Sequence, residues 1–272
     1  MIIGSREFDT DNHTYIMGIL NVTPDSFSDG GRYSRLDAAL THAQEMVMEG
    51  ADILDVGGES TRPGHVQISE EEEIERTAPV IEKLKKEFDV PVSIDTYKSR
   101  VARAALQAGA GLVNDIWGLK YDENMALLIA ESGAACCLMH NREKAEYQNF
   151  FPDVLMDLEK SVNIARKAGI KKDKIILDPG VGFGKTYEMN LEIIKQLNRL
   201  QFLGYPVLLG TSRKSVIGLT LDLPADQREE GTLVTTVMGM LSGCAFVRVH
   251  DVKANKRALK MAEAIMREHQ GV

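Results

Sequence analysis

The stretch YIMGILNVTPDSFSDGGRYSRLDAALTHAQEMVMEGADILDVGG, residues 15–58, contains the unit that decides the fold. It opens with one apolar run, YIMGILNV, and closes with another, ADILDVGG. Between them, apolar side chains recur with helical periodicity over residues 34–50, with Ser34 as the expected N-cap and Gly50 as the stop. A strand, a helix and a second strand rich in Val, Ile and Leu predict a parallel sheet that is buried on both faces.

The same alternation continues along the 272 residues. Eight apolar runs occupy residues 15–22, 51–58, 91–96, 111–116, 134–140, 174–180, 206–212 and 245–251. Helical segments are expected at 34–50, 69–88, 98–108, 122–132, 153–168, 188–202, 226–243 and 252–268. Eight strand–helix units in about 250 residues predict a (β/α)8 TIM barrel, formed by residues 1–272 as a single domain. A doubly wound open sheet is the alternative, because periodicity alone does not separate the two folds.

Two local patterns add detail to this prediction. In the second helix, Ser69 and Glu72 form a capping box, and Pro79 is expected to kink or split the helix. The first eight residues, MIIGSREF, resemble a short extra strand or hairpin. We expect this strand to pair with residues near 14–17 and to cover the bottom of the barrel.

Composition excludes several classes of function. The net charge is −8 without a dominant basic patch, which argues against binding to nucleic acid. No apolar run reaches about 18 residues, and the N-terminus turns polar after three residues, so neither a membrane span nor a signal peptide is expected. The three cysteines fit buried positions in a reducing compartment. These features predict a cytoplasmic protein.

Polar side chains gather where the apolar runs end. In both candidate folds the carboxyl ends of parallel strands line the ligand site. A lone Asp or Asn after a strand is commonly a cap or a turn former, and Asp115 and Asp251 are interpreted in that way. The residues that together indicate a site are Asn21, Glu59, Thr61, Arg62, Asp95, Asn114, His140, Asp178, Ser212, Arg213, Lys214, Arg248 and His250.

Part of this set suits a planar heterocycle. Asp95, Asn114 and Asp178 offer carboxylate and amide groups at three strand ends. A carboxylate that faces an N–C–NH2 edge makes paired hydrogen bonds, which charge strengthens. These three residues therefore predict a ligand ring with several N–H donors.

The rest of the set suits an anion. Cationic side chains at the strand ends are typical of phosphate or pyrophosphate binding, and they are Arg62, Lys214, Arg248 and His250. Asn21 adds an oxygen ligand, and Asp25 or Asp29 could add another. One or two protein oxygens together with phosphate oxygens fit Mg2+.

Three motif-like stretches are rejected. PGVGFGKT, residues 179–186, has Pro179 where a phosphate loop requires glycine. GESTR, residues 58–62, has Arg62 where a nucleophile elbow requires glycine. Lys214 could form a Schiff base only if it were desolvated, and its neighbours, TSRKS, are polar.

Seven motifs in this order resemble the bacterial dihydropteroate synthase family: ILNVTPDSFSDGG, ILDVGGESTRPG, SIDTYKSRVARAAL, GLVNDIWG, LDPGVGFGKT, LLGTSRKSVIG and VRVHDV. The resemblance covers about residues 14–267. It implies a (β/α)8 barrel, usually a homodimer, that condenses 6-hydroxymethyl-7,8-dihydropterin pyrophosphate with p-aminobenzoate. The implied products are 7,8-dihydropteroate and pyrophosphate, and sulfonamides are expected to compete with p-aminobenzoate.

The resemblance also implies roles for individual residues. The pterin would contact Asp95, Asn114, Met139, Asp178, Phe183 and Lys214. The p-aminobenzoate pocket would comprise Phe27, Thr61, Pro63, Lys214 and Ser215. The pyrophosphate would contact Asn21, Thr61, Arg62, Arg248 and His250, with Asn21 also holding Mg2+. Direct action on the reacting groups is expected from Asp29, Arg62, Lys214, Arg248 and His250.

Two features stay open. After LMH, residues 138–140, the family often continues Met-x-Gly-x-Pro, whereas this chain has Asn141 and Arg142, so the resemblance does not predict the conformation or role of that loop. The loops at 23–33 and 59–69 are expected to order only around ligands. The alternative functions are a methyltetrahydrofolate-type pterin methyltransferase and a non-catalytic pterin-binding paralogue. The cationic residues favour the synthase over both, because neither alternative needs a pyrophosphate site.

Overall fold

The computed structural model describes residues 1–23, 32–60 and 66–267. Eight parallel strands form one sheet in the order β8-β7-β6-β5-β4-β3-β10-β9, and a bridge between Leu177 and Val207 joins its two ends. The strands are β3 (Tyr15–Asn21), β4 (Ile53–Gly57), β5 (Val92–Asp95), β6 (Leu112–Asp115), β7 (Ala135–Met139), β8 (Ile175–Asp178), β9 (Leu208–Leu209) and β10 (Phe246–Val249). The predicted barrel is therefore confirmed, and the open sheet is wrong.

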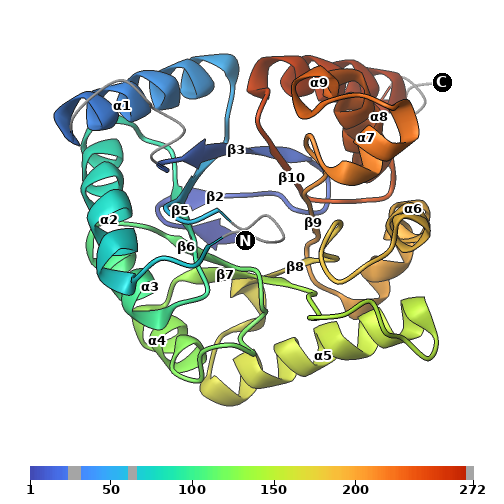
Figure 1. Cartoon of the computed structure of the whole chain (residues 1–272), viewed down its shortest axis with the longest axis horizontal. Coiled ribbons are helices and arrows are strands. Elements are labelled where there is room, and N and C mark those ends of the chain that lie inside the picture. The colour runs from blue at the N-terminus through green and yellow to red at the C-terminus, as the bar shows by residue number, and fades with distance from the viewer. Residues whose placement is uncertain (24–31, 61–65, 268–272) are drawn as a thin grey trace.

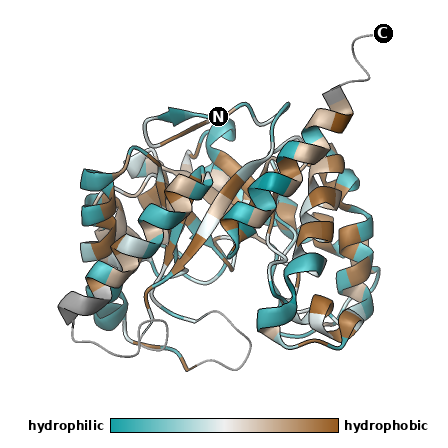
Figure 2. Ribbon diagram, turned by 90° about the horizontal axis from the view of Figure 1, so that it is seen from above, coloured by the Kyte–Doolittle hydropathy of each residue, from teal (hydrophilic) through white to brown (hydrophobic). Residues whose placement is uncertain are grey.

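Helices form an outer ring around the strands (Figure 1). They are α1 (Arg32–Glu49), α2 (Glu70–Glu87), α3 (Ser99–Gln107), α4 (Met125–Ser132), α5 (Phe150–Ala168), α6 (Tyr187–Lys195), α7 (Ser215–Leu221), α8 (Glu229–Leu241) and α9 (Val252–Arg267). Short 3-10 helices cover Lys172–Lys174, Leu197–Leu203 and Ala225–Gln227. Hydrophobic residues run through the strands and along the helices that cover them (Figure 2). None of the described helices is long and apolar enough to cross a membrane.

The helix ends test the local predictions. Ser69 is the N-cap of α2, and its hydroxyl accepts a hydrogen bond from the backbone N–H of Glu72 at 3.2 Å, which confirms one half of the predicted capping box. The Glu72 carboxylate instead accepts from Arg76. Gly50 follows the end of α1 with a φ of +101°. The N-cap prediction for Ser34 is wrong, because α1 already begins at Arg32. Pro79 lies inside α2, which continues as one helix, so of the predicted kink or split the split is wrong.

The last quarter of the barrel differs most from expectation. The predicted strand at 206–212 shortens to the two residues of β9, and the helix predicted from 226 begins at Glu229. Sequence periodicity missed α7, a helix of seven residues. So short a helix gives too few turns for a periodic signal, and Gly218 in its middle lowers its intrinsic propensity.

The N-terminal residues close the bottom of the barrel. They form the hairpin β1 (Ile2–Ile3) and β2 (Arg6–Glu7), so the predicted pairing with residues near 14–17 is wrong. The predicted position is confirmed, because Ile3 and Phe8 are buried against the first residues of several strands, including Phe246. Figure 1 shows β2 and the N-terminus near the middle of the ring. This apolar plug leaves the opposite end of the barrel for chemistry.

Candidate active site

The strand register aligns polar residues at the carboxyl ends of the barrel. Asn21 pairs with Gly57, Gly57 pairs with Asp95, and Asp95 pairs with Asn114 in neighbouring strands. Asp178 ends β8 beside Met139 of β7. The structure therefore brings together the pterin-site residues that sequence reasoning selected from four strands. Asp95, Asn114 and Asp178 are all buried.

Arg248 joins this acceptor group. Its Nε donates to Asp55 Oδ2 at 2.6 Å, and its second guanidinium nitrogen, Nη2, donates to Asp95 Oδ2 at 2.7 Å. Asn114 Nδ2 also donates to Asp55 Oδ2, at 3.1 Å. The sequence analysis assigned Arg248 to the cationic residues that suit an anion. In the structure it lies between the carboxylates of Asp55 and Asp95. Sequence reasoning missed Asp55, although a carboxylate inside the apolar run ILDVG was a usable signal.

Two carboxylate oxygens at this site have no hydrogen-bond partner. Asp55 Oδ1 and Asp95 Oδ1 are buried and unpaired within the described residues. An unpaired buried acceptor costs free energy unless a ligand supplies a donor. Burial raises the pKa of Asp95 above its ordinary value, although the charge of Arg248 opposes this shift. The Asp95 carboxyl is therefore suited to receive N–H groups from a ligand.

Lys214 and Phe183 lie on the other side of the site. Lys214 Nζ donates to the carbonyl oxygen of Val181 at 2.6 Å and lies 4.8 Å from the centre of the Phe183 ring. Burial lowers the pKa of Lys214 to about 8, although the charge of Asp178 opposes this shift. Lys214 is thus more desolvated than its polar sequence neighbours indicated. Phe183 packs with Met139 in a small apolar cluster, which supports their placement near one ligand ring.

His250 and Asp251 contact the loop after β9. Ser212 Oγ lies 2.9 Å from His250 Nδ1 and accepts a hydrogen bond from the His250 backbone N–H. Arg213 pairs with Asp251 at 2.7 Å, which fits the structural reading of Asp251. Ser215 begins α7 and is exposed. Asp25, Phe27, Asp29, Thr61, Arg62 and Pro63 lie outside the described residues.

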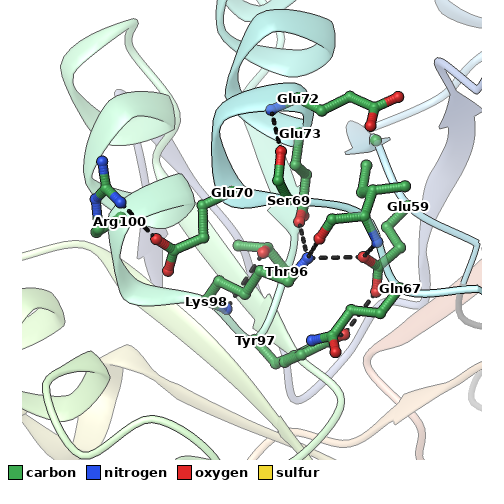
Figure 3. Close-up of polar contacts among 12 residues, drawn as sticks. Glu59, Gln67, Ser69, Glu70, Glu72, Glu73, Thr96, Tyr97, Lys98 and Arg100 are labelled. Carbon is green, nitrogen blue, oxygen red and sulfur yellow. Dashed lines mark hydrogen bonds and ion pairs between the residues drawn. The ribbon is translucent and has the colours of Figure 1, made fainter.

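A buried charge cluster stands beside β5 (Figure 3). Lys98 Nζ donates to Glu59 at 2.7 Å and to Glu73 at 2.8 Å, and each of these three side chains is 5% exposed or less. The Tyr97 hydroxyl donates to Glu59 at 2.6 Å. Burial alone would lower the pKa of Lys98, but hydrogen bonds to both carboxylates raise it above its ordinary value. Sequence reasoning selected Glu59 but missed Lys98 and Glu73, which lie 39 and 25 residues from their partners.

Comparisons with known proteins agree with this geometry. The family model for pterin-binding enzymes matches residues 17–250. The dihydropteroate synthase of Clostridium beijerinckii is 59% identical over 98% of this chain and 100% of its own length. The dihydropteroate synthase of Bacillus subtilis is 55% identical over 93% of this chain and 89% of its own length.

Solved structures give the same result. Clostridium difficile dihydropteroate synthase, crystallised in the presence of pteroic acid, has a TM-score of 0.94 at 53% identity, covering 96% of this chain and 100% of its own. The Yersinia pestis enzyme in a sulfonamide complex has a TM-score of 0.92 at 39% identity, covering 98% and 99%. The Xanthomonas albilineans enzyme with 4-aminobenzoic acid has a TM-score of 0.90 at 41% identity, covering 96% and 94%. This chain belongs to the dihydropteroate synthases within the pterin-binding enzyme family.

Proposed function

We propose that this protein is a transferase that condenses 6-hydroxymethyl-7,8-dihydropterin pyrophosphate with p-aminobenzoate, giving 7,8-dihydropteroate and pyrophosphate for folate biosynthesis. The observation that carries the proposal is the aligned row Asn21, Asp95 and Asn114, in which Asp95 keeps a buried carboxylate oxygen without a partner. A pterin supplies the missing N–H donors. The relatives, crystallised with pteroic acid and 4-aminobenzoic acid, support both substrates.

Pterin recognition is assigned to the acceptor group. Asp95 and Asp178 accept from the ring N–H groups, since a carboxylate and an N–C–NH2 edge form charge-assisted paired bonds. Asn114 adds its amide, which Asp55 already holds in place. Lys214 lies near Asp178 and donates to the ring, while Met139 and Phe183 pack near its face.

The reaction is a substitution at the pterin methylene carbon. Pyrophosphate leaves with the electrons of the C–O bond, and the methylene carbon becomes cation-like through conjugation with the electron-rich ring. The amine of p-aminobenzoate then forms the C–N bond and loses a proton to water. Arg62, Arg248 and His250 compensate the charge that develops on the leaving group. Because the cation forms first, an SN1-like path requires no strong base.

Magnesium is assigned to Asn21. Asn21 ends β3 with a half-buried side chain, and its side-chain oxygen lies beside Gly57. No group of three or more His, Cys, Asp or Glu within residues 1–23, 32–60 and 66–267 could hold a metal. One amide oxygen fits Mg2+, which keeps several water or phosphate ligands. When bound, the ion would neutralise negative charge on the pyrophosphate.

The p-aminobenzoate pocket is placed at the start of α7. Lys214 and Ser215 lie at this helix start, and the family resemblance adds Phe27, Thr61 and Pro63. The sulfonamide complex of the Yersinia pestis relative supports the proposal that sulfonamides compete with p-aminobenzoate here.

We further assign a homodimer to this chain. Five large apolar side chains are between 40% and 67% exposed on the neighbouring helices α7 and α8, and they are Leu219, Leu221, Val234, Met238 and Leu241. Exposed apolar patches of this kind mark association surfaces. A single domain over residues 1–272 and a cytoplasmic location stay predictions.

The test is the release of pyrophosphate with and without p-aminobenzoate, in the presence of Mg2+. We expect release that depends on p-aminobenzoate and that a sulfonamide inhibits. A pterin methyltransferase would instead transfer a methyl group and release no pyrophosphate, and a pterin carrier would bind without turnover. Carbon and oxygen isotope effects at the methylene C–O bond test the SN1-like path, which requires C–O cleavage before C–N bond formation.

A further inference from the structure

The loop after β8 is packed against the loop after β7. The loop after β8 covers residues 179–186 and carries Phe183, and the loop after β7 covers residues 140–149. A β-carbon at Gly180 would collide with the carbonyl oxygen of His140, and one at Gly184 would collide with the carbonyl oxygen of Arg142. The two backbones are therefore in direct contact, which only glycine permits at these points.

The ammonium group of Lys185 connects the two loops. Its Nζ donates to the carbonyl oxygens of Gly180 at 2.8 Å and Phe183 at 3.0 Å, and lies 2.8 Å from His140 Nδ1. All three N–H donors of the ammonium group thus have partners within the protein. This is the lysine of the PGVGFGKT motif, and it binds its own loop where a phosphate-loop lysine would bind a nucleotide.

His140 lies next to Asp157 of α5, and its buried Nε2 has no hydrogen-bond partner among the described residues. Burial and the charge of Lys185 lower the pKa of His140 to about 2, so the ring is neutral. A neutral ring that accepts at Nδ1 carries its proton on Nε2, which lies 3.4 Å from Asp157 Oδ2. Asp157 in turn accepts from Arg142 Nε at 2.7 Å.

Two residues of the loop after β7, which departs from the family pattern, also contact the loop after β8. The Arg142 guanidinium lies 4.2 Å from the centre of the Tyr147 ring, and the Tyr147 hydroxyl donates to the carbonyl oxygen of Gly184 at 2.7 Å. Lys185 and Tyr147 therefore hold neighbouring carbonyls of the loop that carries Phe183. The departure at Arg142 thereby has a structural role.

We propose that Lys185 is a positioning residue for the pterin site, acting through the loop that carries Phe183. Lys185 fixes the carbonyls of Gly180 and Phe183 from inside, and Lys214 fixes Val181 from the side of the site. Phe183 is thereby held in the apolar cluster with Met139. The proposal rests on the proposed function, because it takes the pterin as the ligand at Phe183.

The experiment compares Lys185→Met with Lys195→Met, which removes an exposed lysine at the end of α6. We expect Lys185→Met to weaken the binding of 6-hydroxymethyl-7,8-dihydropterin pyrophosphate by about tenfold, in line with the loss of its hydrogen bonds. The KM for p-aminobenzoate should change less than twofold. Tyr147→Phe should weaken pterin binding in the same direction by a smaller factor, and Lys195→Met should leave it unchanged.

A pH profile separates positioning from a purely structural role. Burial lowers the pKa of Lys185 to about 7, with Asp178 opposing this and Lys214, Arg142 and Lys120 adding to it. Since the charged form donates all three bonds, pterin binding by the wild type should weaken as the pH rises through about 7. This loss of pterin affinity near pH 7 should be absent from Lys185→Met. The pH dependence that comes from Asp95 and Lys214 should be present in both proteins.

Equal pterin binding by the wild type and Lys185→Met would overturn the proposal, as would equal loss of affinity for both substrates. If Lys185→Met does not fold, the wild-type pH profile and Tyr147→Phe decide. The proposal would be overturned if the wild type kept its pterin affinity as the pH rises through 7 and Tyr147→Phe bound the pterin as tightly as the wild type. Direct titration of the pterin pyrophosphate without p-aminobenzoate keeps this test independent of turnover, so failure of the proposed function is recognised separately.

Discussion

Two lysines at the same end of the barrel have opposite environments, and Lys98 is buried whereas Lys185 is half-buried. Lys98 donates to the carboxylates of Glu59 and Glu73, which raise its pKa (Figure 3). Lys185 donates to two backbone carbonyls and faces a neutral histidine, and burial lowers its pKa to about 7. A lysine with two anionic partners stays charged throughout the neutral range. A lysine held by dipoles alone changes its charge within that range.

The two lysines hold different parts of the molecule in place. Both backbone polar groups of Ile68 are held by the Lys98 cluster, since its N–H donates to Glu59 and its carbonyl accepts from Lys98. This cluster therefore fixes the described end of the loop after β4 at any neutral pH. Lys185 instead holds the loop that carries Phe183 beside the pterin-binding residues. The comparison predicts that loss of Lys98 acts on stability and that loss of Lys185 acts on ligand binding.

The largest effect is expected for Lys98→Met. Removing the cation leaves two buried carboxylates without compensation, which costs about 3–5 kcal/mol of unfolding free energy. Denaturant unfolding measures this loss. The triple variant with Glu59→Gln and Glu73→Gln should recover part of it, because both uncompensated charges are gone. A Lys98→Met protein as stable as the wild type would show that the cluster contributes little to the framework.

The next effect is expected for Asp95→Asn. The amide removes the charge that Arg248 and the ligand share, so pterin binding should weaken by about 100-fold, in line with charged hydrogen bonds of about 1.5–3 kcal/mol. Calorimetric titration with the dihydropterin pyrophosphate measures the change. Asp115→Asn is the matched control, because its carboxylate binds the backbone N–H groups of Trp117 and Leu119. An equal loss of pterin affinity in the two variants would show that Asp95 does not bind the pterin.

The pH dependence of pterin binding gives a third prediction. Burial raises the pKa of Asp95, and the ionised carboxylate is the form that accepts from the ring. Binding should therefore weaken as the pH falls, and this should begin at a higher pH than for an ordinary carboxylate. In Asp95→Asn this acidic limb should disappear, whereas an unchanged limb would assign it to another group.

The smallest effect on stability is expected for Lys185→Met. The substitution loses hydrogen bonds but also removes the cost of partly burying a charge without an anionic partner, so the free energy of unfolding should change by about 1 kcal/mol or less. Denaturant unfolding beside Lys98→Met gives the direct comparison. A loss as large as that of Lys98→Met would remove the distinction between the two lysines.

The sequence predicts those features of the structure that follow from a repeated pattern along the chain. The alternation of apolar runs and helices indicates the barrel, and position at the strand ends places Asn21, Asp95, Asn114 and Asp178 in one site. It does not predict partners that only the closed barrel brings together. Arg248 meets Asp55 across 193 residues, and Lys185 meets His140 across 45. Such pairs have no local pattern.

Local conformation was predictable only where side chains decide it. The Ser69 cap follows from a side chain that binds the backbone of its own helix. The internal pairing of the N-terminal hairpin and the helix α7 were missed because these elements are only two to seven residues long, too short for periodicity. The hairpin's position still follows from Ile3 and Phe8, whose burial requires an apolar surface.

The most direct test of the central claim is the stoichiometry of a single turnover. Enzyme in excess over 6-hydroxymethyl-7,8-dihydropterin pyrophosphate, with Mg2+ and saturating p-aminobenzoate, should form dihydropteroate and pyrophosphate in equal amounts. The same measurement with Asp95→Asn should show a much smaller yield at matched concentrations. Tight binding of the pterin pyrophosphate by the wild type, with neither product formed, would contradict the assignment of this site to the condensation.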